Sequence, residues 1–535
     1  MEQRNVLIFF VLSIMIFMVW GELFPNQTVQ DSVNVSQQQT SSANATAQSG
    51  QEITLNPDDV PELRPSDESV NTASVAKDVQ PQGQQFVLQN DRLRMSMDDR
   101  GWITDAEFLQ YTDSIESGSP QVHMFTTSES IQRYFNAGLI GSKRTGPFVK
   151  ISESSVDGGT VFLFHAPVEQ GKQWQRQITL IPGSYLIHLQ DRIIGGAGIK
   201  MFRQVVERNP DRNLDTFYEH VGPIGFLNHE LKEVGYDDLD DDGPVKLAAI
   251  GGWTGMMNRY FIAAMVGNSE QDYRYYYKGD GRSYQSGVLD DGIVEDNGVL
   301  FDSTLYVGPK SISLLRGLNL DLERSVDYGY FAFIAKPMHD FMMWMNSYIS
   351  NFGFCIILLV VAIKILFFYP TQKAYESMAS MRKIQPEMVR LKDLYGDDRQ
   401  KMGQEMMKLY KKHKVNPMGG CLPILIQIPV FFALYKVLLM SIEMRQAPFI
   451  GWIHDLSVQD PYFVLPVAMG LSMFIQQKLN PQPTDPMQAK VLQFLPPVFT
   501  IMFLFFPSGL VLYWLVNNIL SIAQQYYVLK VKDAI

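Results

Sequence analysis

Six apolar stretches constrain the fold of this chain more than any other feature. They cover about residues 6–24, 348–369, 419–440, 461–475, 491–506 and 510–529. A helix of about 20 mainly apolar residues crosses the hydrocarbon core of a bilayer. We therefore predict a multi-domain membrane protein with six transmembrane α-helices, comprising an N-terminal anchor over residues 1–24 and a five-helix core over residues 348–529.

The first stretch has two interpretations. Residues 6–24 follow Arg4 and are nearly uncharged, which is typical of a membrane anchor and also of a secretory signal peptide. A signal peptide normally ends in a small-residue cleavage site of the Ala-x-Ala kind. This region lacks such a site. We expect an uncleaved anchor, with a removed signal peptide as the alternative.

Basic residues between the second and third stretches predict the orientation in the membrane. They are Lys373, Arg382, Lys383, Arg390, Lys392, Arg399, Lys401, Lys408, Lys411, Lys412 and Lys414. Short loops rich in Lys and Arg remain in the cytoplasm. We therefore expect this segment and both ends of the chain to be cytoplasmic, and residues 25–335 to lie on the opposite side.

The long segment outside the cytoplasm is acidic. Residues 25–335 contain 25 Lys and Arg against 42 Asp and Glu, a net charge of −17, which argues against direct binding of nucleic acid. Residues 25–84 are rich in Gln, Ser, Thr and Asn, which predicts a flexible linker. Over residues 85–335, short apolar stretches alternate with turn signals, which is typical of an antiparallel β-sandwich.

Apolar residues recur at helical spacing within the basic cytoplasmic segment. They are Met381, Ile384, Met388, Leu391 and Tyr395, followed after Gly-Asp-Asp at 396–398 by Met402, Met406 and Leu409. This spacing predicts an antiparallel helical hairpin over residues 371–416. Its charges either solvate a simple connector or form a docking surface.

Two shorter segments flank the predicted core. Residues 336–347 are apolar with Trp344 and a few polar residues, which suits a helix lying among lipid headgroups. The alternative is that they begin the next span. Residues 530–535 form a short cytoplasmic tail.

The chain lacks the sequence signatures of common enzymes. It contains no Gly-x4-Gly-Lys-Ser/Thr loop for ATP, no His-Glu-x-x-His and no Gly-x-Ser-x-Gly. Its two cysteines, Cys355 and Cys421, lie in or beside apolar stretches and form no metal-binding pattern. We expect no catalytic residues, no cofactor and no metal.

Polar residues inside the apolar stretches are the best candidates for a functional site. Lys364 lies in the second stretch, where a lysine costs about 2.5–3.5 kcal/mol at the bilayer centre. Other polar or amphipathic groups in the stretches include Gln427, Lys436, Gln476, Gln477, Trp514, Asn517, Asn518, Gln524 and Gln525. Together they favour a wet, positive cavity open to the cytoplasm, whereas for Lys364 alone the alternative is snorkelling to the interface. The short stretch at 461–475 adds the expectation of a locally thin bilayer.

Several local sequences resemble one known family. They are Tyr-Glu-Ser-Met at 375–378, Asn-Pro-Met-Gly-Gly-Cys-Leu-Pro at 416–423, Trp-Ile-His-Asp-Leu at 452–456 and Phe-Pro-Ser-Gly-Leu-Val-Leu-Tyr-Trp at 506–514. In this order they closely resemble the YidC membrane protein insertases, in the Gram-negative form with a large periplasmic domain. The match covers about residues 326–529 and extends more loosely into the outer domain.

The resemblance implies roles for particular residues. It implies a hydrophilic substrate groove closed to the outside, with Lys364 at the position of the family's usual arginine and with Gln476 and Trp514 as groove residues. We place Gln427 and Asn517 in the same groove because they are polar residues within the apolar stretches. Lysine keeps the charge of that arginine but lacks its bidentate fork. Along the fifth span, the resemblance implies an apolar exit path for substrate over Met502, Phe503, Phe505 and Phe506.

The function that the resemblance implies is insertion and folding of nascent inner-membrane proteins without ATP hydrolysis, alone or with the Sec translocon. Expected partners are the nascent chains, membrane lipids, and a ribosome or targeting factor at the hairpin residues Arg382, Lys383, Arg390, Lys392, Arg399 and Lys401. Two rival functions predict different observations. A solute channel or carrier predicts transport by the purified protein, and an anchor displaying a ligand-binding β-sandwich predicts activity without the groove.

Overall fold

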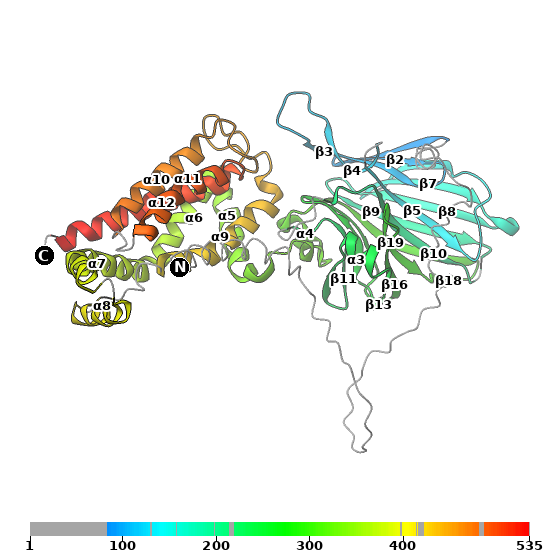
Figure 1. The fold of residues 1–535 in the computed structure, drawn as a ribbon. Coiled ribbons are helices and arrows are strands. Elements are labelled where there is room, and N and C mark those ends of the chain that lie inside the picture. The colour runs from blue at the N-terminus through cyan, green and yellow to red at the C-terminus, as the bar shows by residue number, and fades with distance from the viewer. Residues whose placement is uncertain are drawn as a thin grey trace, which may run out of the picture. The chain divides into compact units, whose positions relative to one another are not determined.

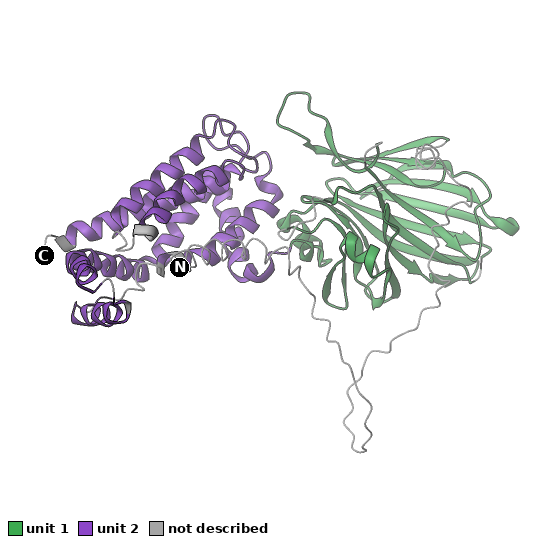
Figure 2. Ribbon diagram, in the orientation of Figure 1, with its two compact units in different colours: residues 1–326 green, residues 327–535 purple. Residues whose placement is uncertain are grey.

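The computed structural model forms two compact units, Met1–Val326 and Asp327–Ile535 (Figure 2). It describes residues 83–128, 131–156, 158–196, 198–212, 219–395, 398–413, 415, 422–480 and 486–533. The predicted N-terminal anchor and all but the last two residues of the predicted linker lie outside the described residues.

The first unit is built from two antiparallel sheets (Figure 1). The nine-stranded sheet has the order β1 (Gln85–Gln89), β2 (Leu93–Asp98), β3 (Ile103–Thr112), β4 (Gln121–Thr127), β5 (Gln132–Ile140), β10 (Lys200–Arg208), β17 (Ser283–Asp290), β16 (Asp272–Gly279) and β13 (Val245–Ile250). The other sheet has the order β12 (Glu230–Glu233), β11 (Gly222–Leu227), β14 (Trp253–Met257), β15 (Phe261–Val266), β19 (Gly298–Pro309), β9 (Leu186–Ile194), β8 (Gln173–Leu180), β7 (Gly159–Pro167) and β6 (Val149–Val156), with β18 (Ile293–Glu295) also paired to β19. Two short helices, α3 (Tyr236–Asp241) and α4 (Ile312–Leu318), accompany the sheets.

Alternating side chains explain why these segments pair as strands. In β8 every second residue, from Trp174 to Leu180, is buried, as expected when one face of a sheet lies on a core. Aromatic rings from the two sheets meet in that core, for example Phe108 of β3 and Phe261 of β15, whose ring centroids are 4.5 Å apart. The prediction of an outer region rich in β-structure is confirmed.

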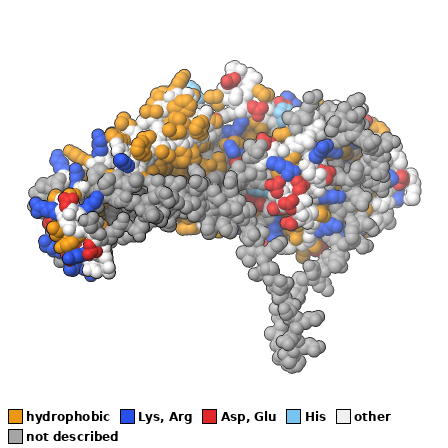
Figure 3. Space-filling model, in the orientation of Figure 1, with side chains coloured by type: hydrophobic (Ala, Val, Ile, Leu, Met, Phe, Trp, Pro, Cys, Tyr) orange, Lys and Arg blue, Asp and Glu red, His pale blue; other side chains and the backbone are white. Residues whose placement is uncertain are grey.

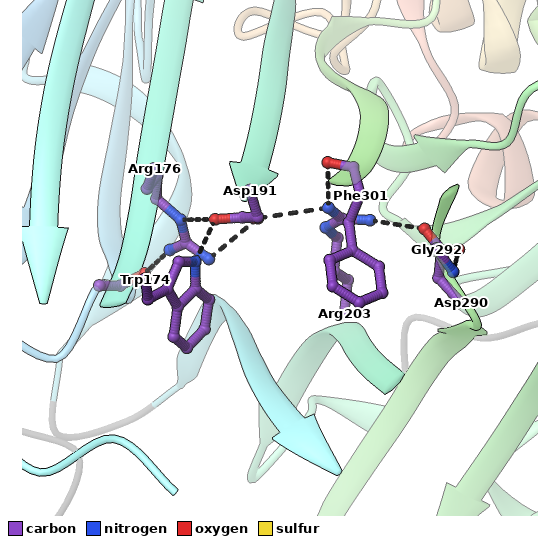
Figure 4. Close-up of polar contacts among 8 residues, drawn as sticks. Trp174, Arg176, Asp191, Arg203, Asp290, Gly292 and Phe301 are labelled. Atoms are coloured by element: carbon purple, nitrogen blue, oxygen red, sulfur yellow. Dashed lines mark hydrogen bonds and ion pairs between the residues drawn. The ribbon is translucent and has the colours of Figure 1, made fainter. Parts of the chain in front are cut away.

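A chain of buried charges crosses this core between the two sheets (Figure 4). Asp191 of β9 accepts hydrogen bonds from Arg176 Nε and Trp174 Nε1 of β8, each at 2.6 Å. Arg203 of β10 donates to Asp191 at 3.2 Å and to Asp290 of β17 at 3.3 Å. Alternating charges therefore link strands of one sheet to strands of the other.

The second unit is helical. Its helices are α5 (Ala332–Ile349), α6 (Phe352–Leu366), α7 (Phe368–Tyr395), α8 (Arg399–His413), α9 (Leu422–Met440), α10 (Val464–Leu479), α11 (Pro486–Phe503) and α12 (Ser508–Asp533). Helix α12 packs against α6, α7, α9 and α10, whereas α11 packs mainly against α10 and α5 packs against α6 and α9. The predicted segment 336–347 lies within α5, so the predicted domain boundary at 335 falls inside this helix.

Within the described residues, no single helix is both long and apolar enough to cross a membrane by itself. One bent pair, α6 with α7, reaches that length and composition together, with an angle of 70° between the two helices. Shorter apolar helical stretches cover Ile426–Met440 and Ala489–Phe503.

Helices α7 and α8 pack against each other through an apolar cluster. Ile384, Met388 and Leu409 are buried there together with Val415. These residues belong to the helical spacing seen in the sequence, apart from Val415, which follows α8. Gly396 and Asp397 of the predicted turn lie outside the described residues.

Candidate functional site: a cation against the polar face of α12

Lys364 lies in the last turn of α6, just before the bend into α7. A cation at this position faces the negative end of the helix dipole, which is a favourable electrostatic placement. The side chain is half-buried, whereas the next two residues, Ile365 and Leu366, are 71% and 74% exposed. Lys364 is therefore turned away from the apolar outer surface on which its neighbours lie.

The partner of Lys364 is a neutral hydroxyl on α12. Lys364 Nζ donates to Ser521 Oγ at 2.7 Å, and Ser521 Oγ donates to the backbone carbonyl of Asn517 at 2.7 Å. Ser521 and Asn517 are both buried. One turn further along the same face, Gln524 Nε2 donates to the carbonyl of Phe368 at 3.3 Å. A polar row on α12 thus faces the junction between α6 and α7.

Trp514 begins this face of α12 two turns before Ser521. Its ring contacts Phe431 of α9 at 5.0 Å and Phe503 of α11 at 5.7 Å between centroids. Its indole Nε1 is buried and has no hydrogen-bond partner among the described residues. A buried indole donor normally has a partner, so Trp514 retains an unused donor beside the rings of Phe431 and Phe503.

The other predicted groove amides do not bond to Lys364. Gln427 of α9 donates its side-chain amide to the hydroxyl of Tyr513 on α12. Gln476 is half-buried on α10, and no hydrogen bond joins it to Lys364, Gln427 or Trp514 within the described residues. The structure therefore links Lys364 through Ser521 to the backbone carbonyl of Asn517. Ser521 is a residue that the sequence prediction missed. The available signal was its spacing of four residues from Asn517.

The predicted exit residues point in different directions. Phe503, the last residue of α11, is buried and contacts Phe506 at 5.0 Å, while Phe506 contacts Tyr435 of α9 at 6.1 Å. Met502 and Phe506 are half-buried, and Phe505 is 74% exposed. Phe503 and Phe506 thus form an aromatic contact between α9 and the end of α11, whereas Phe505 faces outward.

The loop before α10 is fastened to the first turn of α12. Asp460 is fully buried, and its carboxylate accepts hydrogen bonds from Trp452 Nε1 at 3.0 Å and from the backbone N–H groups of Tyr462 and Leu465 at 3.0 and 2.8 Å. In α12, the backbone N–H of Ser508 donates to the Val458 carbonyl at 2.7 Å. This loop covers the end of the helical unit opposite the bend at Lys364.

The loop is also tied to α6. Asn351 caps the start of α6 by accepting from the N–H of Phe354 at 3.2 Å, and its side-chain amide donates to the Phe449 carbonyl at 3.0 Å. The N-terminal ends of α6 and α12 are therefore both hydrogen bonded to one loop.

The predicted docking residues lie on α7 and α8. Arg382, Lys383, Arg390 and Lys401 are exposed, and Lys392 is half-buried. The side chain of Arg399 lies outside the described residues. Figure 3 shows Lys and Arg side chains gathered over α7 and α8, while hydrophobic side chains gather over α10 and α11. Basic and apolar surfaces are thus separated along the helical unit.

Two family models match the chain. One is described as "60Kd inner membrane protein" and matches residues 344–534, and the other is the "YidC periplasmic domain" and matches residues 85–341. The two matches cover the helical part of the chain and its β-rich part in turn.

Known proteins are similar over most of the chain. The membrane protein insertase YidC of Magnetococcus marinus is 44% identical over 80% of this chain and 80% of its own. That of Marinomonas sp. is 36% identical over 97% of both chains. A crystal structure of an active YidC insertase with its first transmembrane domain resolved covers 83% of this chain and 93% of its own, with 18% identity and a TM-score of 0.39.

Proposed function

The chain belongs to the YidC family, and from this premise we propose that it inserts nascent membrane proteins into the bacterial inner membrane through a cationic, hydrated groove that opens to the cytoplasm. The observation that carries the proposal is the contact between Lys364 and Ser521 in an otherwise apolar helical unit. The large β-rich domain is then periplasmic, and both chain ends are cytoplasmic. Hairpin residues 371–416 extend into the cytoplasm.

A cation in this position needs a polar environment. A lysine inside a bilayer is costly unless water or polar groups solvate it. Ser521 and the carbonyl of Asn517 supply neutral acceptors, which leave the positive charge uncompensated. An acidic or polar segment of a substrate would find in this groove a charge of opposite sign and water for its own polar groups.

Insertion through such a groove needs no ATP. Burying apolar surface contributes roughly 25 cal/mol per Å², so a substrate's apolar span gains free energy when it enters lipid. The remaining barrier is the passage of its polar tail across hydrocarbon. A groove that hydrates the tail for part of the distance lowers that barrier, while the span leaves along Met502, Phe503, Phe505 and Phe506.

The loop fastened by Asp460 supports a groove that is closed on the periplasmic side. Its hydrogen bonds join it to the starts of α6 and α12, so the end of the helical unit away from Lys364 is covered. Closure on one side is what an inserter requires, because a pore open at both ends would leak ions. The groove then admits a tail from the cytoplasm alone.

The remaining surfaces suit the expected partners. Exposed Phe333, Trp344 and Tyr348 on α5 fit the lipid headgroup region, where aromatic side chains are favoured. The exposed basic residues of α7 and α8 fit a ribosome or a targeting factor, because a basic patch attracts a partner of negative charge. Cooperation with the Sec translocon is part of the same proposal.

Replacing Lys364 with alanine is expected to slow insertion of single-span substrates with acidic tails by about tenfold, the equivalent of about 1.4 kcal/mol. The charge is lost while the groove remains, so Lys364→Arg should retain most activity. Insertion is measured by protease accessibility of the substrate tail after depletion of the wild-type protein.

The matched control is Lys478→Ala. Lys478 is an exposed lysine whose Nζ lies 4.7 Å from the ring centroid of Phe474, away from the contact with Ser521. Its replacement should leave insertion unchanged. Equal rates for wild-type protein and Lys364→Ala on every acidic substrate would remove Lys364 from the mechanism.

A further inference from the structure

Two buried amides on α12 face α10. Asn518 and Gln525 are seven residues apart, so they lie two turns apart on one side of the helix. Asn518 Nδ2 donates to Ser472 Oγ at 3.1 Å. Gln525 Nε2 donates to Asn480 Oδ1 at 2.9 Å and to the Leu479 carbonyl at 3.3 Å. We call these two contacts the α10–α12 clasp.

Each contact of the clasp gives the N–H group of a buried amide a hydrogen-bond acceptor, which hydrocarbon cannot provide. Ser472 is buried and its hydroxyl donates a hydrogen bond to the Met469 carbonyl at 2.5 Å, so its oxygen can accept from Asn518. Gln525 reaches the end of α10, where the last carbonyls have no partner within the helix. Directional bonds of this kind fix both the distance and the rotation of two helices.

Helix α11 is attached in a different way. It meets α10 at Gly470, where an added Cβ would lie 1.9 Å from Thr500 Oγ1, so the two helices approach closely. At the end of α11, the contacts of Phe503 and Phe506 with α9 and α12 are between aromatic rings. Ring contacts lack the directionality of the amide bonds, and they permit sliding.

We propose that Asn518 and Gln525 are positioning residues that lock α10 to α12, so that the bundle opens for a substrate between α9 and α11 while the α10–α12 wall remains in place. This inference rests on the proposed insertase function and specifies that the contact between α10 and α12 stays closed during insertion. Asn518 and Gln525 need not touch the substrate, because they act by holding α10 in position beside the groove.

The first test removes the amides. Asn518→Ala is expected to slow insertion about threefold, as the loss of one average intramembrane hydrogen bond would, and Asn518→Ala with Gln525→Ala about tenfold. Gln493→Ala, which removes an exposed amide from α11, is the matched control and should insert at the wild-type rate. Wild-type rates for the double variant would overturn the inference.

The second test replaces the clasp with a covalent link. In a chain with Cys355 and Cys421 changed to alanine, Ser472→Cys with Asn518→Cys is joined by a short, reducible bifunctional thiol reagent. Linking is expected to restore the insertion rate that the two substitutions lower. A misfolded variant would not be rescued in this way, so the readout separates positioning from general damage.

The comparison pair joins α9 to the segment that follows α11, where we expect the bundle to open. Tyr435→Cys with Phe506→Cys, joined by the same reagent, is expected to block insertion until the link is reduced. Loss of insertion on linking 472 to 518 would show that α10 must leave α12, and would overturn the inference. If both Lys364→Ala and the double variant Asn518→Ala with Gln525→Ala insert at the wild-type rate, the proposed function fails together with the inference. If only Lys364→Ala slows insertion, the inference about α10 and α12 fails and the proposed function stands.

Discussion

Replacing Asp191 with asparagine is expected to lower the free energy of unfolding of the β-rich unit by about 3–5 kcal/mol. The substitution removes the only charge shared by Arg176 and Arg203 in the network described above, and both guanidinium groups are almost fully buried. A buried cation that loses its partner keeps its desolvation cost without the compensating attraction. Thermal unfolding of the full-length protein in detergent, followed by tryptophan fluorescence, measures the change.

An exposed pair in the same unit provides the control. Arg94 and Glu107 form an ion pair at 2.9 Å, with the arginine side chain 45% exposed. Exposed pairs contribute about 0.2–1 kcal/mol, so Glu107→Gln should shift unfolding only slightly. Equal shifts of the thermal unfolding transition for Asp191→Asn and Glu107→Gln would show that the buried network contributes no more stability than an exposed ion pair.

The same network predicts how stability depends on pH. Burial alone would raise the pKa of Asp191, but Arg176 and Arg203 outweigh it and hold the pKa below its usual value. A group whose pKa is lowered by folding stabilises the native state above its unfolded pKa, and this contribution disappears as pH falls through the folded pKa. Acid should therefore destabilise the wild-type unit more steeply than the Asp191→Asn variant.

Replacing Asp460 with alanine is expected to open the end of the helical unit that we propose to be the closed, periplasmic end of the groove. The buried carboxylate accepts two hydrogen bonds from the loop before α10 and one from the first turn of α10, and a hydrogen bond to a charged group contributes about 1.5–3 kcal/mol. Without them, the loop should detach from α12. A cysteine at position 364, in a chain without Cys355 and Cys421, should then react with an impermeant thiol reagent added from the periplasmic side.

The control for this loop is Asp455→Ala. Asp455 is half-buried, and among the residues that the structure describes its side chain accepts only from the backbone N–H and hydroxyl of Ser457, two residues away. Its loss should leave the loop attached and position 364 protected from outside. Protection that persists in Asp460→Ala would show that closure does not depend on this carboxylate.

Some of this architecture was predictable because it follows from local patterns. Alternating burial along β8 and the helical spacing of Ile384 and Met388 are visible in the sequence, since they depend on residues close together in the chain. The prediction of Lys364 as a site residue came from a cation in an apolar stretch. The structure adds its contact with Ser521 but does not test its role.

The buried charge network depends on distant residues and left no local signal. Asp191 and Asp290 are linked through Arg203, so the buried charge network exists only once strands far apart in sequence are paired. The bend before α7 was also missed, although Pro370 carries a signal. Pro370 lies in the first turn of α7, where the missing N–H of a proline breaks no helical hydrogen bond, and this favours a helix that starts near Phe368.

Side-chain direction was the least predictable property. The hydrogen bond from the Gln427 amide to the hydroxyl of Tyr513 could not be predicted from the sequence, and the groove position of Gln427 stays a prediction. A single serine in an apolar helix, such as Ser521, gives no sign of its partner, because which helix it faces is decided by packing.

We propose that Lys364 lies in a hydrated groove that is reached from the cytoplasm alone. The most direct measurement is the reaction of a cysteine at position 364, in a chain without Cys355 and Cys421, with an impermeant thiol reagent applied to each side of the membrane. We predict rapid labelling in inverted vesicles, whose cytoplasmic face is outward, and none in intact spheroplasts. Absence of labelling from the cytoplasmic face, or labelling from the periplasmic face with Asp460 intact, would contradict this account.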